Sequence, residues 1–266
     1  LFLVLTLSLL WVPPRWDEWV YLDFVWFPLN PSGWWVPHPP LLWYLLAAFS
    51  LIPRMAILMC SLVSMLFLFY ACKRLYGAKV ARLAMANLAA NWLYMPLGSL
   101  IMFTDGPMTA FMTISMISFL CWLKLDEKKF LLISGLGLTL ASLTKYTAAP
   151  IILATFLVWL IVLRKHLHPA KILKTLGVAA VSLLPLVYWI YLVYQTWGSF
   201  HSYYFASYDP FSSPSLSIFA FNIVFYAACT LALINGSLIS WVRQHQFDLD
   251  SKLLLAYIAV IFLLFV

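Results

Sequence analysis

The sequence predicts an all-α polytopic membrane protein from its composition, its long uncharged stretches and the distribution of its basic residues. Of the 266 residues, 65% are hydrophobic and only 9% are charged, whereas soluble domains are about half apolar and a quarter charged. The thirteen Trp among many other aromatic residues suit a protein with side chains at the depth of lipid headgroups. The net charge of +7 comes from basic residues scattered between apolar runs, so no nucleic acid partner is expected.

Five uncharged stretches are long enough to cross a bilayer. A helix needs about 20 apolar residues to span a hydrocarbon core of about 30 Å. Charged residues lie between consecutive stretches, which separates one crossing from the next. The expected crossings are residues 55–72, 83–104, 106–123, about 175–195 and about 216–242.

Two further segments need a different interpretation. Residues 130–163 would form one helix about 51 Å long, too long for a single crossing, and Lys145 and Pro150 interrupt it. We therefore predict two short crossings that meet near Lys145. Residues 41–52 are only twelve in number, a length typical of an interfacial or re-entrant segment rather than of a span.

This arrangement of crossings sorts the basic residues strongly. Thirteen of the sixteen Lys and Arg residues fall on one face, and only Arg15, Arg54 and Lys145 fall on the other. Because cytoplasmic loops are rich in Lys and Arg, the face with thirteen is assigned to the cytoplasm. If residues 41–52 crossed the membrane, the basic residues between 73 and 82 would lie outside and this asymmetry would be lost.

The same arrangement sorts the acidic residues. Those on the cytoplasmic face lie beside lysines and are interpreted as solvated loop charges. The external face receives carboxylates from three separate loops, which is an unusual concentration for so apolar a chain. The external acids are Asp17, Glu18, Asp23, Asp105 and Asp209, and the cytoplasmic ones are Asp126, Glu127, Asp248 and Asp250.

Residues 1–266 are expected to form a single domain, because the chain contains no internal repeat, low-complexity tract or linker. Both ends fall inside apolar stretches and look truncated. The first stretch lacks the basic flank and the small-residue cleavage site of a signal peptide, so a truncated transmembrane helix is preferred. All four Cys lie inside apolar runs, where they predict neither a disulfide framework nor a metal site.

The first external loop, residues 13–53, is where chemistry is expected. Its many aromatic residues are typical of short helices lying in the membrane interface. Asp17 and Glu18 sit among these rings, in the sequence Trp16-Asp17-Glu18-Trp19. Partial desolvation raises the proton affinity of such carboxylates unless a cation or hydrogen bond compensates. A functional role is favoured over simple exposure for Asp17, and is more evenly balanced for Glu18.

Four short motifs, in this order, resemble the integral-membrane glycosyltransferases of the GT-C superfamily. They are Asp17-Glu18 in the first external loop, His38-Pro39-Pro40-Leu41 at its end, Thr104-Asp105-Gly106-Pro107 at the start of a later helix, and Leu143-Thr144-Lys145-Tyr146 between two helices. The closest branch contains protein O-mannosyltransferases and aminoarabinose transferases. The resemblance extends over roughly residues 1–208. No single motif is decisive, but their order on one membrane face is moderately specific.

The resemblance implies a multi-pass protein of the plasma or inner membrane with its active site facing outside. Such an enzyme transfers a sugar from a polyprenyl-phosphate donor to a hydroxyl of a protein, glycolipid or polysaccharide, with inversion. A lipid phosphate is already a good leaving group, so a base near the acceptor hydroxyl matters more than a strong acid. By resemblance, Asp17 is the candidate base, with Glu18 beside it. Lys145 is the candidate cation for the departing phosphate.

Other candidate substrate-binding residues each have a structural alternative. Lys145 could snorkel to the interface instead of binding phosphate. His38, held before two prolines, could be a hydrogen-bonded structural residue. Asp105 could simply cap a helix that has Pro107 in its first turn. In a second external loop near residues 196–215, Tyr203 and Tyr204 could stack on a sugar or lie among headgroups. That loop lacks the basic residue expected for phosphate, which Arg54 could supply.

Cofactors and function leave alternatives open as well. A divalent metal held by Asp17, Asp105 and His38 is possible, but spacing alone does not establish it. The main rival function is a transporter or lipid-linked sugar flippase. Transporters place charges near the bilayer midplane on broken helices, whereas here the acids gather at one face. The sequence therefore favours an enzyme, and it identifies neither the sugar nor the acceptor.

Overall fold

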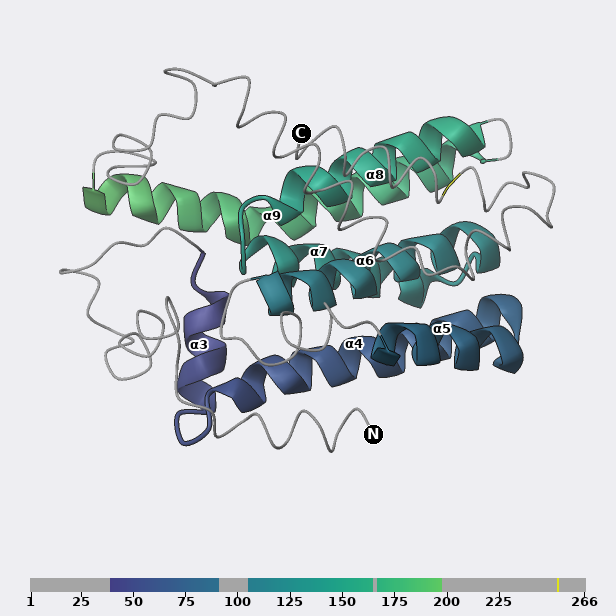
Figure 1. Ribbon diagram of the computed structural model, residues 1–266. Helices are drawn as coiled ribbons and strands as arrows, with labels where there is room; N and C mark the ends of the chain where they lie inside the picture. The colour runs from purple at the N-terminus through teal and green to yellow at the C-terminus, as the bar shows by residue number, and fades with distance from the viewer. Residues whose placement is uncertain (1–38, 91–104, 165–166, 198–252, 254–266) are drawn as a thin grey trace, which may run out of the picture. The chain divides into compact units, whose positions relative to one another are not determined.

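The computed structural model describes residues 39–90, 105–164, 167–197 and 253. Within these ranges the regular structure is α-helical and no strand occurs, which confirms the predicted fold class. The helices, drawn in Figure 1, are α3 (Leu41–Ala48), α4 (Arg54–Tyr76), α5 (Ala78–Ala90), α6 (Asp105–Leu125), α7 (Lys128–Ser142), α8 (Ala148–Leu163) and α9 (Pro169–Trp197).

Three of these helices are long and apolar enough to span a membrane, namely α4, α6 and α9. They cover the predicted crossings 55–72, 106–123 and 175–195, which are confirmed as helices. The predicted crossing 83–104 coincides only in part with α5, which begins earlier, at Ala78. Residues 91–104 and the predicted crossing 216–242 lie outside the described residues.

The stretch 130–163 is two helices, as the sequence predicts. Helix α7 ends at Ser142 and α8 begins at Ala148, so the interruption is centred on Lys145. Pro150 lies in the first turn of α8, directly after the interruption, which agrees with the expectation that Lys145 and Pro150 divide this stretch. A proline is tolerated there, since the N–H groups of a first turn have no partner within the helix. Residues 41–52 contain only the short helix α3, followed by turns.

The chain divides into two compact units. One comprises Leu1–Ile152 and Thr175–Leu192, and the other comprises Leu153–Lys174 and Val193–Val266. In the second unit, the Trp159 indole N–H of α8 donates a hydrogen bond to the Leu253 carbonyl, with an N–O distance of 2.9 Å. That the whole chain forms one domain stays a prediction.

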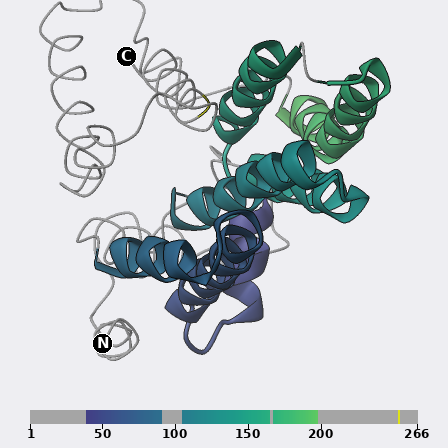
Figure 2. The same ribbon diagram turned by 90° about the vertical axis from the view of Figure 1, so that its right-hand side faces the viewer.

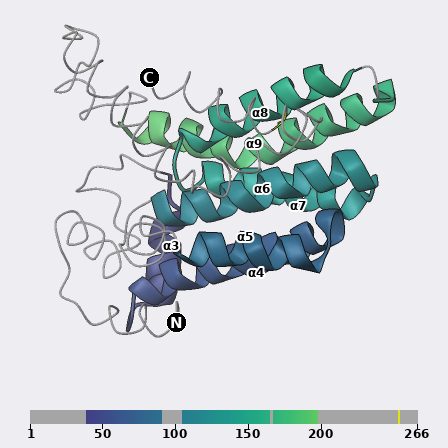
Figure 3. The ribbon, with the colours of Figure 1, turned by 45° about the vertical axis from the view of Figure 1, so that its right-hand side comes forward.

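In the first unit, the α4–α5 and α6–α7 hairpins lie side by side, with α4 against α6 (Figures 1, 2 and 3). The first hairpin turns at Gly77, whose φ of 87° lies in the region that glycine adopts most readily. The second turns at Asp126 and Glu127, between α6 and α7. Glu127 pairs there with Arg74 from the end of α4 and with Lys129 of α7, which ties the two hairpins together.

Small residues let α7 approach both of its neighbours closely. A Cβ placed on Gly137 would lie 2.8 Å from the backbone nitrogen of Ser115 in α6, and one on Gly135 would lie 2.6 Å from Ser182 Oγ in α9. Small residues are the usual contact between helices in membranes, where association depends on close packing and hydrogen bonds. The glycines of α7 therefore set its distance from α6 and α9.

A side chain of α7 also hydrogen-bonds to the backbone of α9 close to a proline. Pro185 lies inside α9, and it has no N–H to donate to the carbonyl one turn earlier. Beside this break, the Ser182 carbonyl accepts a hydrogen bond of 2.7 Å from Thr139 Oγ1. Hydroxyls from neighbouring helices commonly satisfy the backbone near a proline in a membrane helix.

The antiparallel packing separates two sets of charges in the first unit. The Arg74–Glu127 pair lies where α4 ends and α6 turns into α7, whereas Asp105 and Lys145 lie at the opposite ends of α6 and α7. Lys145 is thus separated from the basic residues at the α6–α7 turn, as the sequence predicts. Which side of the membrane each end faces stays a prediction.

Candidate functional site

The candidate site is centred on the linker between α7 and α8, residues 143–147. Lys145 Nζ lies 2.8 Å from Oδ1 of Asp105, the first residue of α6. The partial positive charge at a helix N-terminus favours a carboxylate there. The two side chains are 26% and 53% exposed, so a ligand can reach the ammonium. The structure therefore brings together two of the predicted site residues from segments forty residues apart in the sequence.

The first half of the linker is fixed by α3 and by α7. The Leu41 N–H, at the start of α3, donates a hydrogen bond of 2.9 Å to the Leu143 carbonyl. Thr144 is fully buried, and its hydroxyl donates to the Leu140 carbonyl at 2.8 Å. The start of α3 is therefore hydrogen-bonded to the linker at Leu143, two residues before Lys145.

The second half of the linker is fixed by α9 and α6. The Trp189 indole N–H donates to the Tyr146 hydroxyl at 3.1 Å, and the Thr147 hydroxyl donates to Met108 Sδ at 3.7 Å. Burial raises the pKa of Tyr146 above its usual value, and the Trp189 hydrogen bond opposes this effect more weakly. The Tyr146 phenol is therefore protonated at neutral pH. Each of the five linker residues thus has its own attachment.

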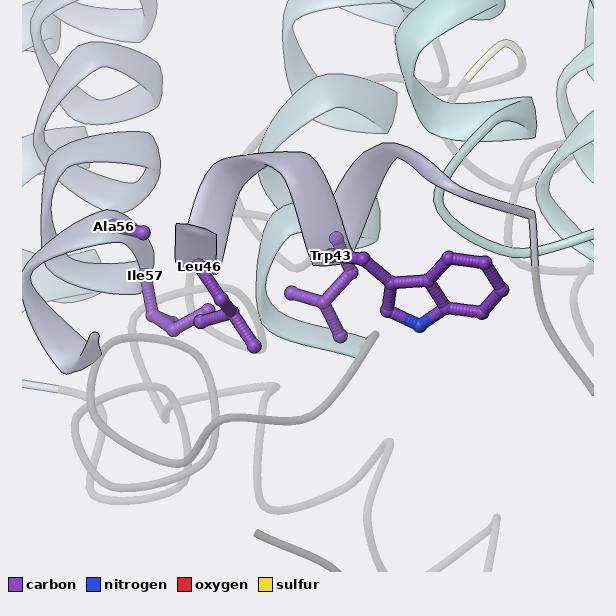
Figure 4. Close-up of a cluster of buried hydrophobic side chains, with 5 residues drawn as sticks. Trp43, Leu46, Ala56 and Ile57 are labelled. Atoms are coloured by element: carbon purple, nitrogen blue, oxygen red, sulfur yellow. The ribbon is translucent and has the colours of Figure 1, made fainter. Parts of the chain in front are cut away.

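An apolar cluster holds α3 against the start of α4. Its buried members include Trp43 and Leu46 of α3 and Ala56 and Ile57 of α4, with Leu46 and Ile57 facing each other in Figure 4. Trp189 of α9 packs against this cluster, and its ring meets Trp43 edge-on, with 6.0 Å between ring centroids and 76° between planes. Edge-to-face geometry is a favourable arrangement for aromatic pairs. The cluster therefore reaches from α3 to the residue that binds Tyr146.

Arg54, the other predicted cation, is the first residue of α4 and is only 7% exposed. It lies at the end of α4 opposite Arg74, next to the apolar cluster. A buried guanidinium is stable only where other groups satisfy its charge and its N–H groups. Its burial indicates that neighbouring protein groups surround the guanidinium, as they would not around a charge in a solvated loop.

The remaining predicted site residues, Asp17, Glu18, His38, Tyr203 and Tyr204, lie outside the described residues. Of the suggested metal ligands Asp17, Asp105 and His38, only Asp105 is described. The described ranges contain no group of three His, Cys, Asp or Glu residues placed to hold a metal ion. A metal site that includes Asp105 therefore stays a hypothesis.

Sequence reasoning did not single out Trp43 or Trp189. Trp43 lies in the first external loop, whose aromatic residues are assigned to the membrane interface, and Trp189 lies within the predicted crossing 175–195. Tyr146 was part of a quoted motif but received no role. The available signal was that Tyr146 is adjacent to Lys145 in the Leu143-Thr144-Lys145-Tyr146 motif.

Comparison with known proteins identifies the family and the fold. The family described as dolichyl-phosphate-mannose-protein mannosyltransferase matches residues 37–189. No curated protein matches the chain significantly. Among solved structures, the crystal structure of ArnT from Cupriavidus metallidurans in the apo state is similar, with a TM-score of 0.62 and 17% identity. The match covers 77% of this chain and 43% of that one.

These matches confirm the resemblance to GT-C glycosyltransferases at the level of family and fold. The ArnT match supports the fold alone, and this chain spans less than half of the ArnT length. The family match includes α3, α4, α6, the linker with Lys145, and α9 as far as Trp189. With its apolar helices, the protein is an integral membrane protein. Because the family match covers more than half of its residues, the chain belongs to the dolichyl-phosphate-mannose-protein mannosyltransferase family.

Proposed function

We propose that the protein transfers a sugar from a polyprenyl-phosphate donor to an acceptor hydroxyl at the external face of the membrane. The name of the dolichyl-phosphate-mannose-protein mannosyltransferase family includes a donor of this kind and a protein acceptor. The arrangement of the described residues supports one feature of this donor, its phosphate group. A cation held near a membrane surface, and reachable by a ligand, suits a lipid-linked phosphate.

The observation that carries this proposal is the position of Lys145. Its ammonium is held 2.8 Å from Asp105 in a linker whose five residues are all attached to neighbouring segments. An ammonium carries three N–H donors, so one bond to Asp105 leaves others for a phosphate oxygen. Preorganised cations stabilise charge that develops on a leaving group. Lys145 is therefore the proposed ligand of the donor phosphate.

In the proposed reaction, the acceptor hydroxyl oxygen attacks the anomeric carbon of the sugar. The bond from that carbon to the phosphate oxygen breaks, and its electron pair leaves with the polyprenyl phosphate. Asp17 takes the hydroxyl proton as general base, with Glu18 beside it. Attack from the face opposite the leaving group inverts the anomeric configuration.

The other candidate residues have supporting roles in this proposal. Asp105 orients Lys145, and Arg54, at the same end of the first unit, adds positive charge near the donor. His38, Tyr203 and Tyr204 are proposed to contact the sugar or the acceptor. A divalent metal bound with Asp105 would add positive charge at the phosphate, and no step above depends on it.

The test is transfer of a labelled sugar from a polyprenyl phosphate in membranes that contain the protein. The wild type should move the label to a hydroxyl acceptor, and Asp17→Asn should abolish transfer while inserting normally. Unchanged turnover in this variant would remove Asp17 from catalysis. Movement of the intact donor across the bilayer without transfer would contradict the proposal and favour a flippase.

A further inference from the structure

Trp189 lies at a junction of three segments in the first unit. Its indole N–H donates to the Tyr146 hydroxyl at 3.1 Å, and its ring meets Trp43 of α3 with 6.0 Å between centroids. Tyr146 directly follows Lys145 in the linker. One indole ring of α9 therefore connects α3 with the residue next to the proposed phosphate ligand.

Neighbouring linker side chains are held by different helices. Lys145 reaches Asp105 at the start of α6, while Tyr146 is bonded to Trp189 of α9. Both Tyr146 and Trp189 are half-buried, so water competes less for their hydrogen bond than it would at an exposed site. Tyr146 points toward α9, and the adjacent Lys145 side chain points toward α6.

The Lys145–Asp105 bond alone is not enough to fix this direction. An exposed ion pair contributes little to holding a side chain in one position, and the Asp105 side chain is 53% exposed. A lysine side chain also has several rotatable bonds, whose freedom opposes a single geometry. The neutral, partly buried bond from Trp189 to Tyr146 supplies a second constraint on the same short linker.

We propose that Trp189 is a positioning residue that directs Lys145 toward the donor phosphate through the Tyr146 hydroxyl. Trp189 does not itself touch the donor. The inference rests on the proposed function for the identity of the ligand. The geometric part, which is that Trp189 restrains Lys145, can be tested without any donor.

The first measurement is the rate at which an amine-specific reagent labels Lys145, read by mass spectrometry of the full chain in detergent. Lys124 in the same sample serves as the reference, since it lies at the other end of α6. Trp189→Phe keeps a ring against Trp43 but removes the N–H. We expect labelling of Lys145 to rise by roughly threefold to tenfold, as for loss of one ordinary hydrogen bond, with Lys124 unchanged. Equal labelling in wild type and variant would overturn the proposal.

The second measurement is the KM for the polyprenyl-phosphate sugar. Trp189→Phe and Tyr146→Phe should each raise this KM by a similar factor, and the double variant should be no worse than either single one, because both remove the same bond. Tyr188→Phe is the matched control, since Tyr188 is exposed on the same helix, and it should leave KM unchanged. Additive effects of the two substitutions would contradict a shared bond.

The dependence on Lys145 separates positioning from general stability. In a Lys145→Ala background, Trp189→Phe should have no further effect on binding of the labelled donor, because its influence passes through the ammonium. A further loss in that background would mean that Trp189 acts only on the fold. If the wild type binds and transfers no donor, the proposed function fails, while the labelling result still decides whether Trp189 restrains Lys145.

Discussion

Among the residues of the first unit that the structure describes, two ion-pair groups have different surroundings. Asp105 and Lys145 meet at the linker that also carries the hydrogen bond from Trp189. Glu127 meets Lys129 and Arg74 at the α6–α7 turn, where all three are at the surface. The first group is held by neighbouring segments and suits ligand binding, whereas the second joins two hairpins.

A pH dependence of stability is expected from Glu127. The hydrogen bond from Lys129, and then the positive charge of Arg74, hold the pKa of Glu127 below its ordinary value. A carboxylate with a depressed folded-state pKa adds stability above its unfolded pKa of about 4.3, and that stability is lost as pH falls through the folded-state pKa. The melting temperature should therefore fall less in Glu127→Gln than in the wild type between about pH 6 and pH 3. Parallel curves for the two proteins would show that Glu127 has no such role.

At the scale of the elements, the contacts of α7 determine how the helices of the first unit pack. Its glycines permit close approach to α6 and α9, and its Thr139 hydroxyl donates to the Ser182 carbonyl of α9. Ser115 Oγ of α6 adds a hydrogen bond of 2.8 Å to the Ser134 carbonyl of α7. Since the linker follows directly on α7, these contacts also place Lys145.

Gly137→Ala should destabilise the protein by about 2 kcal/mol, the usual cost of overpacking a tight core. The new Cβ would lie 2.8 Å from the Ser115 backbone nitrogen, which cannot move aside as a flexible side chain could. Gly177→Ala in α9 is the matched control, because its Cβ would meet nothing within 4 Å, and it should be neutral or slightly stabilising. Unfolding in detergent measures both, and equal stabilities would contradict the close packing of α6 and α7.

Thr139→Val should cost about 1 kcal/mol through loss of the hydrogen bond to the Ser182 carbonyl. Thr113→Val is the control, since the Thr113 hydroxyl bonds only within its own helix, to the Thr109 carbonyl at 2.8 Å. The difference in free energy of unfolding between the two variants isolates the bond between α7 and α9. No difference would mean that the Ser182 carbonyl does not need Thr139.

At the scale of the whole molecule, the proposal depends on which side of the membrane each helix end faces. The asymmetry of Lys and Arg assigns the basic ends to the cytoplasm. Within the first unit, the linker and the α6–α7 turn lie at opposite ends of α7. The linker is therefore assigned to the outside.

Cysteine labelling tests this orientation. A membrane-impermeant thiol reagent should label Thr147→Cys in intact cells, and should label Lys128→Cys only after permeabilisation, because exposed positions 147 and 128 flank opposite ends of α7. The unsubstituted protein controls for the native thiols. The reverse pattern would place Lys145 in the cytoplasm and exclude an external donor site that contains it.

Much of the fold could be predicted from sequence, because uncharged runs of about twenty residues have few alternatives to membrane helices. The break at Lys145 could also be predicted, since one helix over residues 130–163 would be too long. Pro150 comes directly after this break, in the first turn of α8, where a proline is compatible with a new helix. The start of α5 was missed because Lys79 and Arg82 excluded its first turns from an uncharged window.

The site could be predicted only in part. The ordered motifs identified Asp105 and Lys145 as candidates, and the structure pairs them. Asp17, Glu18, His38, Tyr203 and Tyr204 stay predictions. Trp43 and Trp189 could not be identified, because their roles depend on a contact between α3 and α9, helices widely separated in the sequence. Neither residue has a local pattern that distinguishes it from other interfacial tryptophans.

The most direct test of the central claim compares two lysines of the same chain in sugar transfer. Lys145→Ala should raise the KM for the polyprenyl-phosphate sugar by at least tenfold or abolish transfer, because a charged hydrogen bond to phosphate is worth about 1.5–3 kcal/mol. Lys124→Ala, at the other end of α6, should leave both KM and kcat within about twofold of the wild type, since no donor contact is lost there. Equal kinetics for Lys145→Ala and the wild type would contradict a phosphate site at the linker.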